Sequence, residues 1–265
     1  MKKYILKIYV KLFANKMFYN LNLNLFQLSL RGMGISNWQG IVSGEKHFVH
    51  KILPKILKSN NPVFFDVGVN IGDFTKDLVE SFPNSFVYAF EPHPLIYNIL
   101  SENVKDLKNV KINNLALGET LSTLILYDKK ENDGSQHASL YKEVIDELHK
   151  SEVVSYNVEV ETLDNYVIKN KIENIDFLKI DTEGNEYSVL KGATNLLNQK
   201  KIKCIQFEFN EMNIVSRVFF RDFRKILTNY HLYRLLPNSL LKLNDHSIET
   251  ELFAFQNIIA ILKEE

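Results

Sequence analysis

The chain has 265 residues and carries 32 basic and 32 acidic side chains, so its formal net charge is zero. A neutral chain has no overall field that would attract nucleic acid, and a nucleic-acid partner is not expected. Cys204 is the only cysteine, which excludes an internal disulfide and a cysteine-rich zinc site and is typical of the reducing cytoplasm. The length fits one α/β domain with an additional segment.

Residues 1–60 are expected to form an N-terminal helical segment. Lys7, Lys11 and Lys16 interrupt its apolar positions, and no uncharged run reaches the roughly 20 residues that a membrane-spanning helix needs. Neither export nor membrane insertion is expected. The start has the pattern of a basic amphipathic helix, which could dock on the rest of the chain, on a second subunit of a homodimer or on a membrane surface. The first two alternatives are favoured.

From residue 61 the pattern becomes one of short apolar runs that alternate with helical segments. Strands are predicted at residues 63–67, 86–90, 110–114, 175–180 and 203–209. Such alternation is the signature of βαβ units and a parallel sheet. The last two apolar runs, 231–236 and 253–262, are expected to pair as antiparallel strands at the sheet edge. Residues 61–265 are therefore predicted to form one domain with seven strands, mostly parallel.

Two further segments, 121–128 and 153–161, have the pattern of extended chain. Between them lies a polar stretch at 129–139 with the composition of a loop. Helices are expected at residues 141–150 and 187–198.

A glycine-containing loop, D-x-G-x-N-x-G at residues 66–72, follows the first predicted strand. In an open parallel sheet, ligands bind beyond the carboxyl ends of the strands, and Gly68 and Gly72 let the backbone approach a ligand closely. The loop lacks the G-x-G-x-x-G spacing of dinucleotide sites. Asp66 and Asp73 would repel phosphates, whereas S-adenosylmethionine has an ammonium, a sulfonium and no phosphate. The loop therefore indicates S-adenosylmethionine as the cofactor.

Glu91 lies 19 residues after Gly72 at the end of the second strand, where a carboxylate can accept hydrogen bonds from both ribose hydroxyls. Pro92 ends that strand. Asn114, after the third strand, is either an adenine contact or a turn residue. A helix-capping role for Asp66 and a solvated charge at Glu91 are less favoured once the glycines are considered. The predicted cofactor site comprises Asp66, Gly68, Asn70, Gly72, Glu91, Pro92 and Asn114.

The span from residue 63 to about 262 resembles the FkbM-type methyltransferases. The resemblance rests on residues 65–72, 89–92, 114–118, 162–164 and, most specifically, Leu178-Lys179-Ile180-Asp181-Thr182-Glu183-Gly184-Asn185-Glu186. It implies a Rossmann-like class I methyltransferase fold and transfer of a methyl group from S-adenosylmethionine, with S-adenosylhomocysteine as product. The implied acceptor is a hydroxyl oxygen on a sugar of a glycan, a polyketide or another secondary metabolite. Val69 stands where the family commonly has alanine, a conservative departure.

Asp181 is the first candidate for a catalytic base. It follows the strand at 175–180, and an alcohol must lose its proton as its oxygen attacks the methyl group. Its competing roles are a hydrogen bond to the amino group of the donor, or ligation of a divalent ion with Glu183 or Glu208. Proton transfer or substrate orientation is favoured over a metal. Glu183 and Glu208 are expected to contact the acceptor, and for Glu186 a helix-capping role is equally reasonable.

His137 is the second candidate base, because the polar loop that holds it is long enough to fold over the active site. Ser139 in the same loop is a candidate substrate contact. Trp38 suits stacking on a sugar ring, although core packing is favoured.

Two rival functions remain. One is a nucleotide-dependent oxidoreductase, which the missing glycine spacing disfavours. The other is a catalytically silent subunit with a methyltransferase fold, which the intact loop and Glu91 disfavour.

Overall fold

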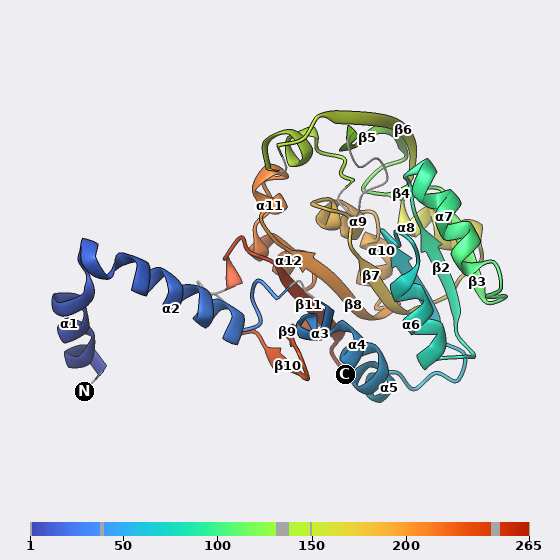
Figure 1. The fold of residues 1–265 in the computed structure, drawn as a ribbon. Coiled ribbons are helices and arrows are strands. Elements are labelled where there is room, and N and C mark those ends of the chain that lie inside the picture. Colours follow the sequence, from blue (N-terminus) through green and yellow to red (C-terminus); the bar gives the residue numbers. More distant parts are fainter. Residues whose placement is uncertain (1, 38–39, 131–137, 149, 245–249, 265) are drawn as a thin grey trace.

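The central sheet places the carboxyl ends of its parallel strands along one edge. The computed structural model describes residues 2–37, 40–130, 138–148, 150–244 and 250–264. Figure 1 shows a twisted sheet with helices on both faces, a smaller sheet above it and N-terminal helices that extend to one side. The strand order is β10-β9-β11-β8-β7-β1-β2-β3. These strands are β1 (Val63–Val67), β2 (Phe86–Phe90), β3 (Val110–Asn113), β7 (Ile175–Ile180), β8 (Ile202–Phe209), β9 (Tyr230–Leu236), β10 (Ser239–Lys242) and β11 (Gln256–Leu262).

The prediction of a mostly parallel α/β sheet is confirmed, but the strand number is eight rather than seven. The additional strand is β10, which is only four residues long and too short to stand out as an apolar run. It forms an antiparallel hairpin with β9 and occupies the sheet edge.

The antiparallel pairing of β9 with β11 is confirmed, but the pair is not at the edge. β11 lies between β8 and β9 and runs antiparallel to both. Its first five residues are all buried, as expected for a strand covered on both faces. The apolar sequence of β11 therefore predicts that the strand is buried. Which strands lie beside it depends on tertiary packing.

A second, three-stranded sheet has the order β4-β6-β5. It consists of β4 (Ala116–Leu117), β5 (Ser122–Lys129) and β6 (Val153–Glu161), so both predicted extended segments are strands. The helix expected at 141–150 is present but shorter and partly π-helical, with residues 142–143 α-helical and η4 (Val144–Leu148) a π-helix. Leu117 and Leu126 from this sheet face the ends of the main parallel strands.

Helices cover both faces of the main sheet. On one face lie η2 (Phe48–Ile52), α5 (Leu53–Ile56), α6 (Asp73–Ser81) and α7 (Pro94–Val104). On the other lie α8 (Leu163–Lys169), α9 (Glu186–Lys191), α10 (Thr194–Asn198) and α12 (Phe220–Ile226). Phe64 and Phe177 pack into the first face, and Phe65 and Leu178, their neighbours along the strands, pack into the second. This alternation follows from the two-residue period of a strand.

The helix expected over residues 187–198 is interrupted between α9 and α10, because the chain passes very close to the small sheet at Gly192. A Cβ atom at Gly192 would overlap the carbonyl oxygen of Gly118. The Gly192 carbonyl also accepts a hydrogen bond from the Asp164 amide at 2.9 Å. Glycine is therefore required here for space.

We expect Gly192→Ala to lower the free energy of unfolding by about 1–3 kcal/mol, the usual cost of overpacking. Urea denaturation measures the change. Gly32→Ala is the matched control, since no atom lies within 4 Å of a Cβ built at Gly32. Equal stability of the two variants would contradict the close contact.

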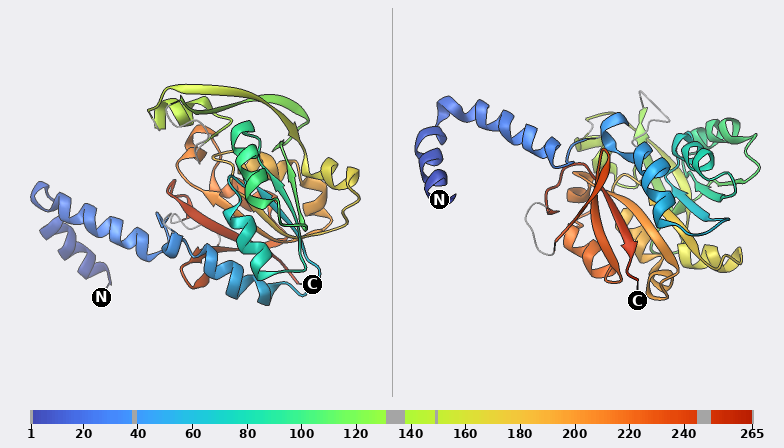
Figure 2. Two further views of the ribbon diagram at one scale, coloured as in Figure 1. Left: turned by 45° about the vertical axis from the view of Figure 1, so that its right-hand side comes forward. Right: turned by 90° about the horizontal axis from the view of Figure 1, so that it is seen from below.

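The N-terminal segment divides into two parts. Residues 2–32, which we call the arm, form α1 (Lys2–Phe13), η1 (Lys16–Phe18) and α2 (Tyr19–Gly32) and extend away from the body (Figure 2). One of the two favoured alternatives, docking of the first helix on the rest of the chain, is not observed, because α1 extends away from the body with exposed side chains. The second part contains α3 (Gly40–Ser43) and α4 (Glu45–His47) and packs on the body. Within the described residues, no helix is both long and apolar enough to cross a membrane.

Candidate active site

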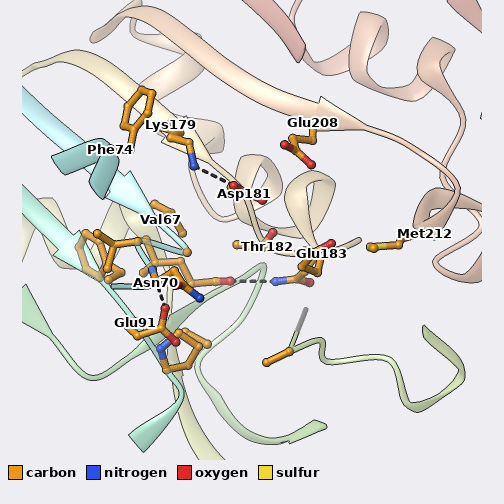
Figure 3. Close-up of a pocket in the computed structure, with 18 of the residues that line it drawn as sticks. Val67, Asn70, Phe74, Glu91, Lys179, Asp181, Thr182, Glu183, Glu208 and Met212 are labelled. Atoms are coloured by element: carbon orange, nitrogen blue, oxygen red, sulfur yellow. Dashed lines mark hydrogen bonds and ion pairs between the residues drawn. The ribbon is translucent and has the colours of Figure 1, made fainter. Parts of the chain in front are cut away.

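A cavity of about 910 Å³ lies at the carboxyl ends of β1, β2, β7 and β8. Pockets for small molecules usually measure about 300–1,000 Å³, so this one has room for a nucleoside and a second small molecule. Figure 3 shows side chains from all four strand ends turned toward the same space. The small sheet and the residues Ser43, Glu45 and Lys46 of α3 and α4 also contribute to the walls.

The glycine loop forms one wall of the cavity. Gly68 has a φ of +78°, and a Cβ atom there would overlap the carbonyl oxygen of Asp181. The amides of Gly68 and Val69 both donate to the carbonyl of Phe90. Asn70 also has a positive φ, and its side chain accepts from the Ile71 amide at 2.8 Å. The loop is thus held against the ends of β2 and β7 by backbone contacts.

Glu91 lies beside this loop and is held by two backbone amides. Its Oε2 accepts from the Asn70 amide at 2.9 Å (Figure 3). Its Oε1 accepts from the His93 amide, also at 2.9 Å. Burial raises the pKa of Glu91 to about 7, although both hydrogen bonds act in the opposite direction. Each carboxylate oxygen has a further lone pair, so the side chain can still accept hydrogen bonds from a ligand.

Four predicted site residues lie behind the cavity wall rather than in it: Asp66, Gly72, Asn114 and Ser139. Asp66 is fully buried and accepts a 2.6 Å hydrogen bond from the Thr75 hydroxyl of α6. The Asn114 amide group donates to the carbonyls of Glu91 and Pro92. Asp66 thus supports the glycine loop from behind, and Asn114 supports the end of β2.

Asp181 lines the cavity and forms an ion pair with Lys179, Nζ to Oδ2, at 2.8 Å (Figure 3). Burial opposes the charge of the Lys179 ammonium group, yet the carboxylates of Asp181, Asp66 and Glu45 raise its pKa above the ordinary value. A cationic Lys179 thus lies among several acidic groups. The ion pair orients one carboxylate oxygen of Asp181.

Glu45, from α4 in the N-terminal segment, is part of the same cluster. The Gln206 side chain donates to its Oε1 at 2.7 Å, and burial raises the pKa of Glu45. Ser43 and Lys46 line the cavity next to it. The sequence analysis missed Glu45 and Lys179 as site residues. No local signal marks Glu45, because its partner Gln206 is 161 positions away.

Glu208 and Glu183 complete the acidic side of the cavity. Burial raises the pKa of Glu208, and the charges of Asp181 and Glu183 raise it further. The Ser139 hydroxyl donates to the Glu183 carbonyl at 2.7 Å, so Ser139 braces the loop that carries Glu183. Glu208 and Glu183 are thereby brought together with Asp181, as expected for residues at adjacent strand ends.

The Glu186 side chain stabilises the loop before α9 and does not cap that helix. Its Oε1 accepts from the amides of Thr182 and Gly184, each at 3.0 Å, and the side chain is buried. His137 and Trp38 lie outside the described residues.

A cluster of three potential metal ligands within the described residues involves His50, Asp77 and Glu80. Asp181 and Glu208 belong to no such cluster among these residues. The ion pair with Lys179 already occupies one oxygen of Asp181.

Comparisons with known proteins identify relatives over most of the chain. The chain is 31% identical over 158 residues to methyltransferase sdnD of Sordaria araneosa, covering 51% of this chain and 61% of that protein. It is 20% identical over 200 residues to the 2-O-methyltransferase NoeI of Sinorhizobium fredii, covering 72% of this chain and 82% of NoeI.

Among solved structures, the FkbM methyltransferase from Methylobacillus flagellatus aligns with a TM-score of 0.48 and 14% identity, over 81% of this chain and 47% of that one. The model of the methyltransferase FkbM domain matches residues 66–235, a span that holds the glycine loop, Glu91, Asp181 and Glu208. The chain therefore belongs to the FkbM methyltransferase family.

Proposed function

We propose that this protein transfers a methyl group from S-adenosylmethionine to a hydroxyl oxygen of a sugar, a glycan or a secondary metabolite. The observation that carries the proposal is one cavity with Glu91 and the Gly68 loop on one wall and the Asp181–Lys179 pair on another. The first wall suits a nucleoside, and the second suits an alcohol that must lose a proton.

The charge of the cavity supports a cationic donor. Of the described residues, eight acidic side chains and two lysines, Lys46 and Lys179, line it. Such a wall attracts the ammonium and sulfonium groups of S-adenosylmethionine and repels the pyrophosphate of a dinucleotide. When bound, S-adenosylmethionine supplies a methyl group on a positively charged sulfur. Gly68, Asn70, Glu91 and Pro92 would hold it, with Asp66, Gly72 and Asn114 supporting the walls behind them.

Asp181 would accept or guide the proton of the acceptor hydroxyl. Its Oδ2 is bound to Lys179, which leaves Oδ1 available to a ligand in the cavity. Positioning of the acceptor oxygen close to the methyl group provides a large part of the rate enhancement in such transfers. The name of NoeI, a 2-O-methyltransferase, supports oxygen as the acceptor atom. Glu183 and Glu208, which line the cavity, would contact the acceptor, and Ser139 supports that side through its hydrogen bond to the Glu183 carbonyl.

Isothermal titration with S-adenosylhomocysteine and with NAD tests the donor. We expect binding of S-adenosylhomocysteine and none of NAD. NAD binding without S-adenosylhomocysteine binding would instead indicate an oxidoreductase.

Comparison of glycans and metabolites from cells with and without the protein, by mass spectrometry, tests the reaction. We expect an acceptor that lacks one methyl group when the protein is absent. Donor binding without any such product would favour a silent subunit.

The affinity for S-adenosylhomocysteine is expected to rise with pH through about 7, the pKa of Glu91. The ionised carboxylate accepts hydroxyl hydrogen bonds more strongly than the protonated form, which must first lose its proton. Below that pKa the affinity should fall by up to about tenfold per pH unit. Titration calorimetry across this range measures the effect, and Glu91→Gln should flatten it. An unchanged slope in that variant would assign the effect to another group.

A further inference from the structure

The arm exposes an unusual amount of apolar surface. Of 25 large apolar side chains that are exposed in the described part of the chain, 14 lie between Tyr4 and Leu28. Met17 is 79% exposed and Tyr4 76% exposed. Single exposed apolar residues are ordinary, but a continuous set of this size marks an interaction surface.

The arm also differs from the body in charge. It contains six of the 32 basic side chains of the chain and none of the 32 acidic ones. The first acidic residue after the start is Glu45. The neutral total therefore conceals a cationic arm on an acidic body.

Three lysines of α1 form one stripe on an otherwise mostly apolar helix. Lys3, Lys7 and Lys11 are spaced four residues apart and share one side, and Ile5, Ile8 and Leu12 lie on the opposite side. Exposed apolar side chains also border the lysine stripe, such as Val10 beside Lys3. Lysine with an apolar opposite side is the pattern of helices that lie in the interface of a membrane.

The two helices of the arm are joined by specific contacts. The Tyr9 hydroxyl donates to the Asn22 side-chain oxygen, and the Asn22 amide group donates to the Phe13 carbonyl at 3.0 Å. Asn15 caps η1 between them. At the C-terminal end of the arm, Leu30 is buried, and just beyond it the Arg234 side chain donates to the Met33 carbonyl. These contacts attach the arm to the body. The arm is thus a defined element that extends from the body (Figures 1 and 2), and its apolar side chains are exposed.

We propose that the arm binds the surface of a lipid bilayer that carries anionic headgroups. Apolar side chains of α1 and α2 enter the interface, and the lysines contact the headgroups through their long side chains. The alternative occupant, the arm of a second copy, would bring two cationic elements together, and like charges oppose that contact. The proposal concerns a surface separate from the cavity and does not depend on the reaction.

Sedimentation of the full chain with phosphatidylcholine vesicles, with and without phosphatidylglycerol, tests the proposal. We expect binding to vesicles with phosphatidylglycerol that weakens as salt is added. The triple variant Lys3→Glu, Lys7→Glu, Lys11→Glu should bind at least about tenfold more weakly. The triple variant Ile5→Ser, Ile8→Ser, Leu12→Ser should also lose binding, because its apolar side is removed.

The matched control reverses three exposed lysines of the body, Lys55→Glu, Lys108→Glu and Lys142→Glu, and should bind vesicles as the native chain does. Titration with S-adenosylhomocysteine or circular dichroism shows that each variant is folded. Equal binding to both vesicle types, or equal loss in the control, would overturn the proposal. Sedimentation velocity tests the alternative, dimerisation through the arm. If the chain forms a dimer that requires the arm and binds no vesicles, the proposal is also overturned.

Discussion

Glu91→Ala is expected to abolish measurable binding of S-adenosylhomocysteine. The carboxylate lines the cavity and is fixed by the amides of Asn70 and His93. In the proposed binding mode Glu91 accepts from two ribose hydroxyls, and each hydrogen bond to a charged group contributes about 1.5–3 kcal/mol. The two together correspond to at least about a hundredfold loss of affinity. Isothermal titration measures it directly.

Two further variants distinguish the loss of the hydrogen-bond acceptor at Glu91 from a general disturbance of the structure. Glu102→Ala, at an exposed position on α7, should leave the affinity unchanged. Glu91→Gln keeps the shape of the side chain but can accept through only one atom, so an intermediate affinity is expected. If Glu91→Ala binds within about threefold of the native protein, the ribose role of Glu91 is ruled out.

Asp181→Asn is expected to lower the rate of methyl transfer by about 10²–10⁴-fold, the usual contribution of a positioned acid or base. The amide has the same shape but cannot accept a proton. In this variant the buried Lys179 still has the acidic groups Asp66 and Glu45 nearby. The fold and the affinity for S-adenosylhomocysteine should therefore change little. Single-turnover kinetics with the identified acceptor, together with titration calorimetry, distinguish the two effects.

Glu208→Gln provides the matched comparison for Asp181. Burial and the charges of Asp181 and Glu183 raise the pKa of Glu208, which favours its protonated form and makes it a weaker candidate for the base. Its loss should therefore affect the affinity for the acceptor more than the rate. A fully active Asp181→Asn variant would exclude Asp181, and a larger rate loss in Glu208→Gln would transfer the role to Glu208.

Several features could be predicted because their signals are local. Strand and helix periods revealed the βαβ units, and the strand ends then had to meet at one edge of the sheet. This placed Gly68, Glu91, Asp181 and Glu208 around one cavity, as the structure shows. The motif around Asp181 indicated the family in the same way, because the motif is continuous in the chain.

Other features depend on contacts between distant parts of the chain. Glu45 reaches the site through Gln206, and the demand for glycine at position 68 comes from the Asp181 carbonyl. Neither contact can be predicted from the neighbouring residues in the sequence, because the partners are distant in the chain. The position of β11 inside the sheet has the same origin, since an apolar run reports burial but not its neighbours.

Asp66 in the glycine loop shows most clearly the difference between what local sequence predicts and what tertiary structure decides. The sequence predicted an α/β chain, a loop for a phosphate-free nucleoside and the family, because period, spacing and residue type are properties of short segments. Tertiary structure alone decided that Asp66 points to Thr75 rather than into the cavity, that Lys179 lies among carboxylates and that the arm leaves the body. Side-chain direction and partners depend on which elements pack together, and packing is decided by the whole chain.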